Sequence, residues 1–501
     1  MGAALLLIKF IGVGILVLSA AILGFAAYIV YNRRKYAHIP QPKLKSFFGG
    51  HLGILHRGRD CTAIIECWIK AYGSILCMHT YHLSRILVYD PAIVKEILRS
   101  EHKKPRYSWF ENIFGERFLG RSLLTETDHQ KWASKRSRLN KAFHKSSLKQ
   151  MVHQFDMCAR GLLDHLKTLA DGKQVIPMAE KFMLLTQDII AKVGFGLDLG
   201  VYAEDGLKFD QALSATFRLK WVHFLPQWFS YPPFGKSRKQ RRLSTSACRM
   251  IRSLGRECIL KRMDDMRNGH ETPIDLLHFI LQEYTIDKSS LTGDWFERIV
   301  DEFVTFFIAG NETTAGLLSF TVLLLGTHPD VQAKVQNEID NVIGRKENIE
   351  YQDLLKLKYL SMVFKEALRL HPPVNSAIRI TSCEVTLNGY TCPKGTFIQC
   401  PHAHLSKLER FYKDPLNFYP ERWADPSCTE SANFNYQYFP FSAGLRTCIG
   451  KEFALIEARL LMARMMETFN IRLEKQTFDV ATVGGTIRPR DGCIVTLTLR
   501  E

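Results

Sequence analysis

The stretch YFPFSAGLRTCIGKEFALIEARLL, residues 438–461, places one cysteine, Cys448, directly before a predicted helix. A helix that starts near Ile449 points its amide N–H groups and the positive end of its dipole back toward the sulfur. That environment lowers the pKa of a thiol and favours the thiolate, the form that binds a metal or acts as a nucleophile. A nucleophilic cysteine also needs a histidine base, and His402 and His404 are the nearest in the sequence. Both roles stay open on this stretch alone.

The longest predicted helix of the body of the protein covers residues 294–325, with Thr292 or Asp294 as its cap and with Gly326 and Pro329 at its end. At about 1.5 Å per residue it would be ~48 Å long, so we expect it to run through the centre of a domain. Its acidic and basic residues argue against a membrane span.

The middle of this helix reads AGNETTAG, residues 309–316, where an ordinary buried helix would have Leu or Ala. Gly and Thr weaken a helix, so another reason for their presence is needed. Gly310 would let a flat group approach the backbone, and Glu312 beside Thr313 could relay protons to a bound ligand. The alternative is a helix kink with solvated polar groups.

A further helix is predicted in LKYLSMVFKEALRLHPP, residues 357–373, and the two prolines end it. Glu366 and Arg369 lie three residues apart and therefore on one face. Such a pair is usually on the surface and worth under ~1 kcal/mol, but the surrounding face is apolar and favours a buried pair. Arg422, in FYPERW, is the expected third partner, because one carboxylate accepts bonds from two guanidinium groups.

The segment HQKWASKRSRLNKAF, residues 129–143, places Trp132 and Arg136 on one helical face. It is either an amphipathic surface helix or a helix that presents an indole donor and a guanidinium to one carboxylate. In the second case its other, basic face suits an acidic partner. The basic residues on that face are Lys131, Lys135 and Arg138.

The N-terminal residues 1–35 are predicted to form one membrane-spanning signal anchor. Residues 10–30 carry no charge and are long enough to cross a hydrocarbon layer of ~30 Å. The basic residues that follow outnumber the single Lys9 before them, so the positive-inside rule puts the body of the protein in the cytosol. No small-residue cleavage site follows, which favours an uncleaved anchor over a signal peptide.

Residues 36–50 contain Pro40 and Pro42 and are predicted to be a stiff hinge, and residues 51–501 a single catalytic domain without linkers or repeats. A hydrophobic content of 46% with 23% charged residues excludes disorder as the main state. The net charge of +17 suits an anionic membrane or an acidic protein, and the scattered basic residues argue against nucleic acid. The 12 cysteines show neither a disulfide framework nor zinc spacing.

The residues around Cys448 fit the pattern F-x-x-G-x-R-x-C-x-G-x-x-x-A, which resembles the haem-binding loop of the cytochrome P-450 monooxygenases. The motifs WASKR, AGNETT, EALR and FYPERW precede it in the order of that family, so the resemblance extends over essentially the whole chain. It implies a cytochrome P-450 fold, mainly α with a smaller β region. This is a triangular helical α+β domain with a long central helix, preceded by the N-terminal transmembrane helix.

The resemblance implies a role for each matching residue. Cys448 would be the thiolate ligand of the iron of haem b, and Glu312 and Thr313 would guide protons to dioxygen. The residues implied to contact haem are Trp132, Arg136, Ala309, Gly310, Arg379, Phe441, Gly444, Arg446, Gly450 and Ala454. Trp132, Arg136, Arg379 and Arg446 among them would bind its propionates. Glu366, Arg369 and Arg422 would form a buried structural triad.

The implied activity is a monooxygenase that inserts one oxygen atom of O2 into a C–H bond. Electrons would come from NADPH through a flavoprotein, NADPH-cytochrome P-450 reductase, whose acidic face would meet Lys131, Lys135, Arg138 and Lys451. The implied location is the endoplasmic reticulum membrane, crossed once, with the catalytic domain in the cytosol. A thiolate-haem isomerase would lack the pair of Glu312 and Thr313, and a haem-binding sensor would need no reductase.

Several stretches, among them DEFVTFFIAGNETTA and KYLSMVFKEALRLHPP, are similar to a sterol side-chain hydroxylase of this family, which implies a hydrophobic sterol substrate. The implied pocket residues are Tyr107, Trp109, Phe110, Asn311, Val374, Asn375 and Ile378. The sterol enzyme has His at the position of Asn311 and bulky aromatics around Asn375 and Ile378. Fatty acids, other steroids and xenobiotics therefore stay open. The segment 221–229 would form a substrate entrance at the membrane through its aromatic residues Trp221, Phe224, Trp228 and Phe229.

Overall fold

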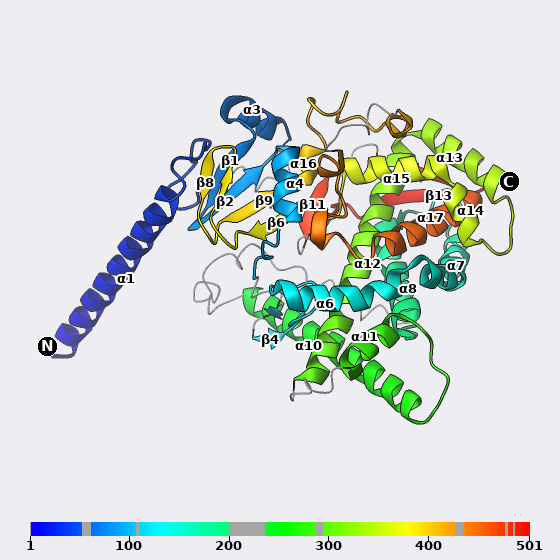
Figure 1. Ribbon diagram of the computed structural model, residues 1–501, viewed down its shortest axis with the longest axis horizontal. Coiled ribbons are helices and arrows are strands. Elements are labelled where there is room, and N and C mark those ends of the chain that lie inside the picture. Colours follow the sequence, from blue (N-terminus) through cyan, green and yellow to red (C-terminus); the bar gives the residue numbers. More distant parts are fainter. Residues whose placement is uncertain are drawn as a thin grey trace. The chain divides into compact units, whose positions relative to one another are not determined.

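The computed structural model describes residues 2–52, 62–106, 111–113, 115–200, 236–286, 294–425, 434–475, 479–483 and 486–500 (Figure 1). These residues divide into two compact units. We call Met1–His102 with Ala377–Pro401 the sheet unit, and Lys103–Ser376 with His402–Glu501 the helical unit. The chain is a mixture of helices and sheets, as the mainly α prediction with a smaller β region requires.

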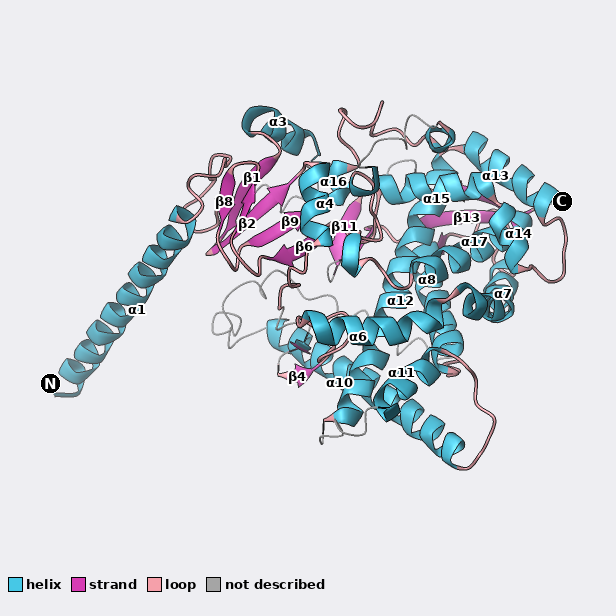
Figure 2. Ribbon diagram, viewed as in Figure 1, coloured by secondary structure: helices cyan, strands magenta, loops and turns pink. Residues whose placement is uncertain are grey.

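The sheet unit contains a four-stranded sheet (Figure 2). Its elements are α1 (Gly2–Arg34), α3 (Thr62–Tyr72), β1 (Ile75–Thr80), β2 (Leu83–Val88), α4 (Pro91–Arg99), β6 (Ala377–Ile380), β7 (Val385–Leu387), β8 (Tyr390–Cys392) and β9 (Phe397–Cys400). The strand order is β1-β2-β9-β6, with β2 parallel to β9 and the other two pairs antiparallel. Asn388 and Gly389 both have positive φ between β7 and β8, as a two-residue hairpin turn demands.

Among the residues that the structure describes, two helices are long and apolar enough to cross a membrane. One is the segment Lys9–Arg34 of α1, of which only 6% is buried. The other is α12 (Trp295–Thr327), which is 83% buried and therefore a core helix. Length and composition alone make α1 the candidate span that the sequence predicts.

The helical unit carries the remaining elements. The helices and short turns are α6 (His129–Leu139), η1 (Asn140–Phe143), α7 (Lys145–Lys167), α8 (Met178–Ile189), η2 (Ile190–Gly194), α10 (Lys236–Arg267), α11 (Leu276–Ile286), α12, α13 (Pro329–Val342), α14 (Tyr351–Lys356), α15 (Lys358–Leu370), α16 (His402–Leu405), η5 (Pro420–Ala424), η7 (Phe434–Tyr436), η8 (Gly444–Arg446) and α17 (Lys451–Thr468). The strands are β3 (Asn112–Ile113), β4 (Glu116–Arg117), β5 (Ile176–Pro177), β10 (Phe469–Leu473), β11 (Val480–Val483), β12 (Thr486–Pro489) and β13 (Ile494–Leu499). They form a three-stranded sheet, β10-β13-β5, and the pairs β11-β12 and β3-β4.

The central helix α12 lies where the sequence predicts it and packs against α8, α10, α15, α17, β10 and β12 (Figure 1). Most of its residues are buried all round, which is typical of a helix through the middle of a core. The residues predicted to cap and to end this helix also make contacts with other elements. Asp294 is at the N-cap position, but its carboxylate accepts from Arg117 Nη1 at 2.6 Å. The helix ends at Thr327, two residues after the predicted Leu325, so Gly326 belongs to its last turn. A Cβ on Gly326 would be 2.6 Å from Cγ of Leu473 on β10, so this glycine also serves the packing of the helix.

Candidate functional site

The loop before α17 closes on itself and presents Cys448. Ser442 and Gly444 have φ of 62° and 69°, a left-handed backbone that favours glycine at the second position. The N–H of Cys448 donates to the carbonyl of Phe441 at 2.9 Å, which fixes the sulfur-bearing residue at the end of the loop. Gly450 then forms the N-cap of the helix. The Gly444 of the motif is therefore required by the loop itself, independently of any ligand.

Cys448 is exposed as a whole residue. The pKa of its thiol is nevertheless raised, because the surrounding protein atoms partly desolvate the sulfur. The N–H of Gly450 and the charge of Arg136 act in the opposite direction without overcoming this effect. The expectation of a lowered pKa is wrong for the protein alone. A metal ion bound to the sulfur would itself displace the thiol proton.

A cationic and aromatic group lies beside this loop. The ring of Trp132 on α6 is buried, and Cζ of Arg446 stacks 4.0 Å from its centre. Arg136, one turn further along α6, donates through Nη1 to the carbonyl of Thr447 at 2.7 Å and through Nε to Oδ1 of Asn140 at 2.9 Å. Burial lowers the pKa of Arg136. The structure thus brings two guanidinium groups and an indole next to the residues that precede Cys448.

An open stripe runs along the middle of α12. Ala309, Gly310 and Thr313 are not buried, whereas nearly all their neighbours on the helix are. The hydroxyl of Thr313 donates to the carbonyl of Ala309 at 2.8 Å. A Cβ on Gly310 would meet Cδ1 of Ile190 at 3.0 Å, so this glycine serves the close packing of α12 on η2. Ala309, rather than Gly310, leaves the stripe uncovered.

Phe143 connects the cysteine loop with the central helix. Its ring stacks on Phe306 of α12 with centroids 5.9 Å apart and meets Phe453 of α17 edge to face at 6.3 Å. A Cβ built on Gly450 would touch the same ring at 3.9 Å. Because Phe306 lies one turn before Gly310, this aromatic contact joins the start of α17 to the part of α12 that carries the open stripe. The sequence gives no sign of this role for Phe143.

The two polar residues in the middle of α12 turn away from one another. Asn311 is fully buried, and its side-chain oxygen accepts from the hydroxyl of Thr186 on α8 at 2.8 Å. This contact places the side-chain oxygen of Asn311 against α8, while its Nδ2 has no hydrogen-bond partner among the described residues. The carboxylate of Glu312 is buried and forms an ion pair with Arg488 of β12. Thr486 donates to its second oxygen at 3.3 Å.

Glu366, Arg369 and Arg422 come together in the core. Arg369 donates to Glu366 through Nε and Nη2, both at 2.9 Å, and Arg422 donates through Nε at 2.8 Å. Trp423 adds an indole bond of 2.9 Å, which the sequence analysis missed although FYPERW ends with this residue. All four side chains are buried. A carboxylate with this many donors fixes α15 to η5.

Ion pairs also hold the chain before α6 on the first turns of α12. Glu302 is fully buried and accepts from the N–H of Leu123 at 2.9 Å and from Lys135 Nζ at 3.1 Å. Burial raises the pKa of Glu302, while the ammonium of Lys135 opposes that rise. Lys135 therefore points inward, and its predicted place on an outer basic face is wrong. Lys131 and Lys451 are exposed.

Gly120 is expected to tolerate no side chain, because its φ is 49° and a Cβ there would lie 2.1 Å from Oδ2 of Asp301. Asp301 has no room to retreat, since it is fully buried and accepts from Arg117, Arg252 and the N–H of Arg121. We expect Gly120→Ala to lower the free energy of unfolding by about 3 kcal/mol, measured by chemical denaturation.

Gly269→Ala is the matched control for the cost of placing a side chain on a residue with positive φ. Gly269 also has positive φ, 74°, but no described atom lies within 4 Å of its Cβ position. This control should lose only about 1 kcal/mol. Equal losses in the two variants would show that the backbone alone matters and that the contact with Asp301 does not.

The remaining predicted site residues lie on several different elements. Val374 is 41% exposed, and the carbonyl of Asn375 accepts from the N–H of Ala403 at 3.1 Å. Ile378 and Arg379 belong to β6 of the sheet unit. Ala454 is on α17, and its N–H donates to the carbonyl of Gly450 at 2.9 Å. Tyr107, Trp109, Phe110 and residues 221–229 lie outside the described residues.

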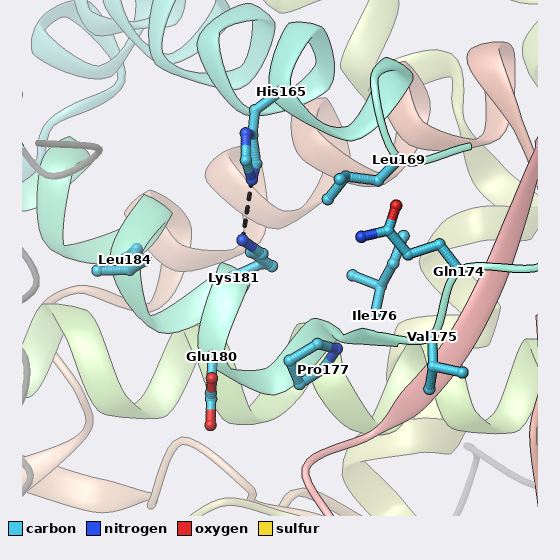
Figure 3. A pocket seen from close by; sticks show the side chains of 9 residues that line it. All are labelled: His165, Leu169, Gln174, Val175, Ile176, Pro177, Glu180, Lys181 and Leu184. Carbon is cyan, nitrogen blue, oxygen red and sulfur yellow. Dashed lines mark hydrogen bonds between the residues drawn. The ribbon is translucent and has the colours of Figure 1, made fainter. Parts of the chain in front are cut away.

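A separate cavity of about 280 Å³ lies between the end of α7, β5 and α8 (Figure 3). Lys181 Nζ donates there to Nε2 of His165 at 2.9 Å, and burial together with this ammonium lowers the pKa of His165. None of the predicted site residues lines this cavity. It contributes nothing to the site around Cys448.

The chain is similar to known proteins over most of its length. The family model "Cytochrome P-450" matches residues 39–488. Secologanin synthase 2 of Catharanthus roseus is 31% identical over 427 residues, which are 82% of this chain and 77% of the relative. Cytokinin hydroxylase of Arabidopsis thaliana is 31% identical over 86% of this chain and 82% of its own length. Cytochrome P-450 3A13 of Mus musculus is 30% identical over 88% and 86%.

The chain belongs to the cytochrome P-450 family. It is therefore a haem-dependent monooxygenase that uses O2. Members of this family take electrons from a redox partner and act on hydrophobic substrates. The relatives differ in the compounds that their names give, so family membership does not define the substrate of this chain.

Proposed function

We propose that this protein is a membrane-anchored monooxygenase that hydroxylates a sterol at a C–H bond, with Cys448 as the ligand of the haem iron. The thiol of the exposed residue Cys448, beside the group of Trp132, Arg136 and Arg446, is the observation that carries the proposal. A thiol in this loop suits iron, and guanidinium groups next to it suit the two carboxylates of haem.

The residues present fit haem. The uncovered stripe at Ala309 and Thr313 on an otherwise buried helix suits a flat ligand that lies against it. The resemblance adds Arg379 of the sheet unit, which is buried and whose Nε and Nη2 atoms have no hydrogen-bond partner among the described residues. Burial lowers the pKa of Arg379, and a guanidinium with unsatisfied donors fits an anionic group. Phe441, Gly444, Gly450 and Ala454 are proposed to contact the ring.

Haem bound through a cysteine thiolate supplies the cleavage of dioxygen and the insertion of one oxygen atom into a C–H bond. The residues of the chain have the remaining tasks. We assign proton donation toward the open stripe to the hydroxyl of Thr313, which in this structure donates to the carbonyl of Ala309, and Glu312, its neighbour in the sequence, would be the acid of the relay. Phe143 and Phe306 keep water from this part of the core.

The proposed electron donor is NADPH-cytochrome P-450 reductase. Lys131 and Lys451 are exposed on the helices that flank the cysteine loop, and Arg138 is partly exposed, so they are the basic residues proposed to meet its acidic face. The proposed location is the endoplasmic reticulum membrane, with α1 as a single span and residues 36–50 as the hinge. The catalytic domain, residues 51–501, would then face the cytosol.

The sterol substrate rests on the similarity of several stretches to cholesterol 24-hydroxylase, and sterol catabolism is the corresponding role. Asn311 differs from that enzyme, and its side-chain oxygen accepts from the hydroxyl of Thr186 on α8. Asn375 and Ile378 remain differences that could shape the pocket. Fatty acids, other steroids and xenobiotics are the alternative substrates.

A spectral binding screen tests the substrate class. The purified haem protein is titrated with cholesterol, oxysterols, fatty acids and drug-like compounds, and the spin state of the iron is recorded. We expect a shift to high spin with sterols, because a bound substrate displaces water. A shift with fatty acids and none with any sterol would overturn the sterol assignment. Turnover of the bound compound under isotopically labelled dioxygen should then place one labelled oxygen atom in the product.

A further inference from the structure

The acid of the proton relay is held by a strand that the sequence motifs do not include. Glu312 is 3% exposed, and its Oε1 forms an ion pair with Nη2 of Arg488 on β12. Its Oε2 accepts from the hydroxyl of Thr486 at 3.3 Å. Thr486 and Arg488 are two residues apart on one strand and therefore point to the same side of it. Both oxygens of the carboxylate thus face β12.

The strand is fixed in this position by its backbone. The N–H of Ile487, between the two contacts, donates to the carbonyl of Pro373 at 2.8 Å. A Cβ on Gly316, one turn beyond Glu312, would lie 3.6 Å from the carbonyl oxygen of Ile487 and 3.3 Å from Cγ of Pro373. Gly316 thus lies in close contact with Pro373, and the bond between Pro373 and Ile487 holds β12 beside α12, with Arg488 within reach of the buried acid.

The geometry separates the acid from the alcohol. Consecutive residues on a helix point about 100° apart, so Glu312 and Thr313 face different sides of α12. Thr313 lies on the open stripe with Ala309, whose carbonyl accepts its hydroxyl proton. Glu312 faces β12. A proton that travels from Glu312 to Thr313 therefore requires the carboxylate to leave Arg488 first.

We propose that Arg488 is a positioning residue of the proton relay, which holds the Glu312 carboxylate ionised and turned toward β12 until the ion pair opens. The side chain of Arg488 is 19% exposed, so the pair connects a buried acid with solvent. When it opens, the carboxylate accepts one proton from a hydronium ion of the solvent, which leaves water. It passes this proton to the oxygen of Thr313 as the hydroxyl proton of Thr313 moves to a basic acceptor bound at the open stripe, so that both side chains return to their starting state. This inference rests on the proposed roles of Glu312 and Thr313.

The test compares Arg488→Gln with wild-type holoenzyme by infrared difference spectroscopy. A buried carboxylate without its cation favours the protonated form. We expect Arg488→Gln to show the C=O stretch of a carboxylic acid at neutral pH, absent from wild type and from the double variant with Glu312→Gln. This readout is independent of turnover. An unchanged infrared spectrum would overturn the inference.

The second readout is coupling, the product formed per NADPH consumed. We expect Arg488→Gln to reduce coupling about tenfold, less than the loss from removing a general acid outright. Arg488→Lys keeps a positive charge and should restore most of the coupling. Thr486→Val retains the ion pair and should cause a smaller loss of coupling. If Arg488→Gln does not fold, Thr486→Val provides the test instead. Unchanged coupling in both variants would overturn the inference.

Arg490→Gln is the matched control, two residues further along the chain. The side chain of Arg490 is 54% exposed, and its Nε lies 4.0 Å from the carboxylate of Asp479, a long distance for an ion pair. Its loss should therefore change neither readout. The reference for the proposed function is Thr313→Ala. If Thr313→Ala uncouples the enzyme and Arg488→Gln does not, the role of Arg488 fails and the proposed function stands. If wild type has no turnover with any substrate, the proposed function fails, while the infrared readout still reports on the ion pair.

Discussion

Cys448→Ala is expected to abolish monooxygenase turnover and to reduce haem content to a small fraction of the wild-type value. The thiolate is the protein's bond to the iron, and its electron donation favours cleavage of dioxygen, which no neighbouring side chain replaces. The fold itself should survive, because Cys448 is exposed and its own N–H bond to Phe441 involves only the backbone. Product formation with reductase, haem content and thermal unfolding are the three measurements.

Cys383→Ser is the matched control, since Cys383 is also exposed but belongs to the sheet unit. It should retain haem and turnover. If Cys448→Ala kept wild-type turnover, or if both variants lost it equally, the assignment of Cys448 as the iron ligand would be wrong. Loss of haem together with loss of the fold would instead indicate a structural role of the loop.

Glu366→Ala is expected to lower the free energy of unfolding by about 3–5 kcal/mol, a large part of the stability of an ordinary domain. Glu366 is fully buried, and its removal leaves the guanidinium groups of Arg369 and Arg422 in the core without their carboxylate. The indole of Trp423 also loses its acceptor. Denaturant titration of the variant gives the loss, and reduced yield of folded protein is the expected companion result.

Asp164→Asn provides the comparison for an ion pair on the surface. Asp164 accepts from Lys167 at 3.0 Å across one helical turn, and both side chains are largely exposed. Its loss should cost less than about 1 kcal/mol. If Glu366→Ala were as mild as Asp164→Asn, the buried triad would not hold α15 to η5 as described.

Local signals were enough to predict the elements that carry the site. The apolar run of α12, the prolines after α15 and the glycines around Cys448 act within a few residues of the structure they determine. Glu366 and Arg369 were predictable for the same reason, since the helical period alone puts them on one face. Arg422 followed only from the chemistry of a carboxylate with room for two guanidinium groups.

Sequence reasoning falls short where a distant segment decides the outcome. Gly326 reads as a helix stop and belongs to the last turn of α12, but the close approach of Leu473 from β10 also makes it a packing glycine. Lys135 reads as a surface cation, but the buried carboxylate of Glu302 draws it inward. Neither of these partners can be assigned from the neighbouring residues in the sequence.

The ion pair between Arg488 and Glu312 could not be predicted from nearby residues either. Nothing near TIRPRDG, residues 486–492, marks one arginine as the partner of an acid on α12. The bond of Ile487 to Pro373, a residue far away in the sequence, helps to hold the strand beside the helix. The motif in α12 thus predicts the acid, Glu312, and the alcohol, Thr313. The residue that positions the acid depends on tertiary contacts.

The absorption spectrum of the purified, reduced and carbon monoxide-bound wild-type protein tests the central claim most directly. The claim is that Cys448 binds haem iron as a thiolate. It predicts stoichiometric haem and the strongly red-shifted main absorption band that thiolate ligation gives to the carbon monoxide complex. The unshifted band of a histidine-ligated haem in folded protein, or failure of folded protein to bind haem at all, would contradict it.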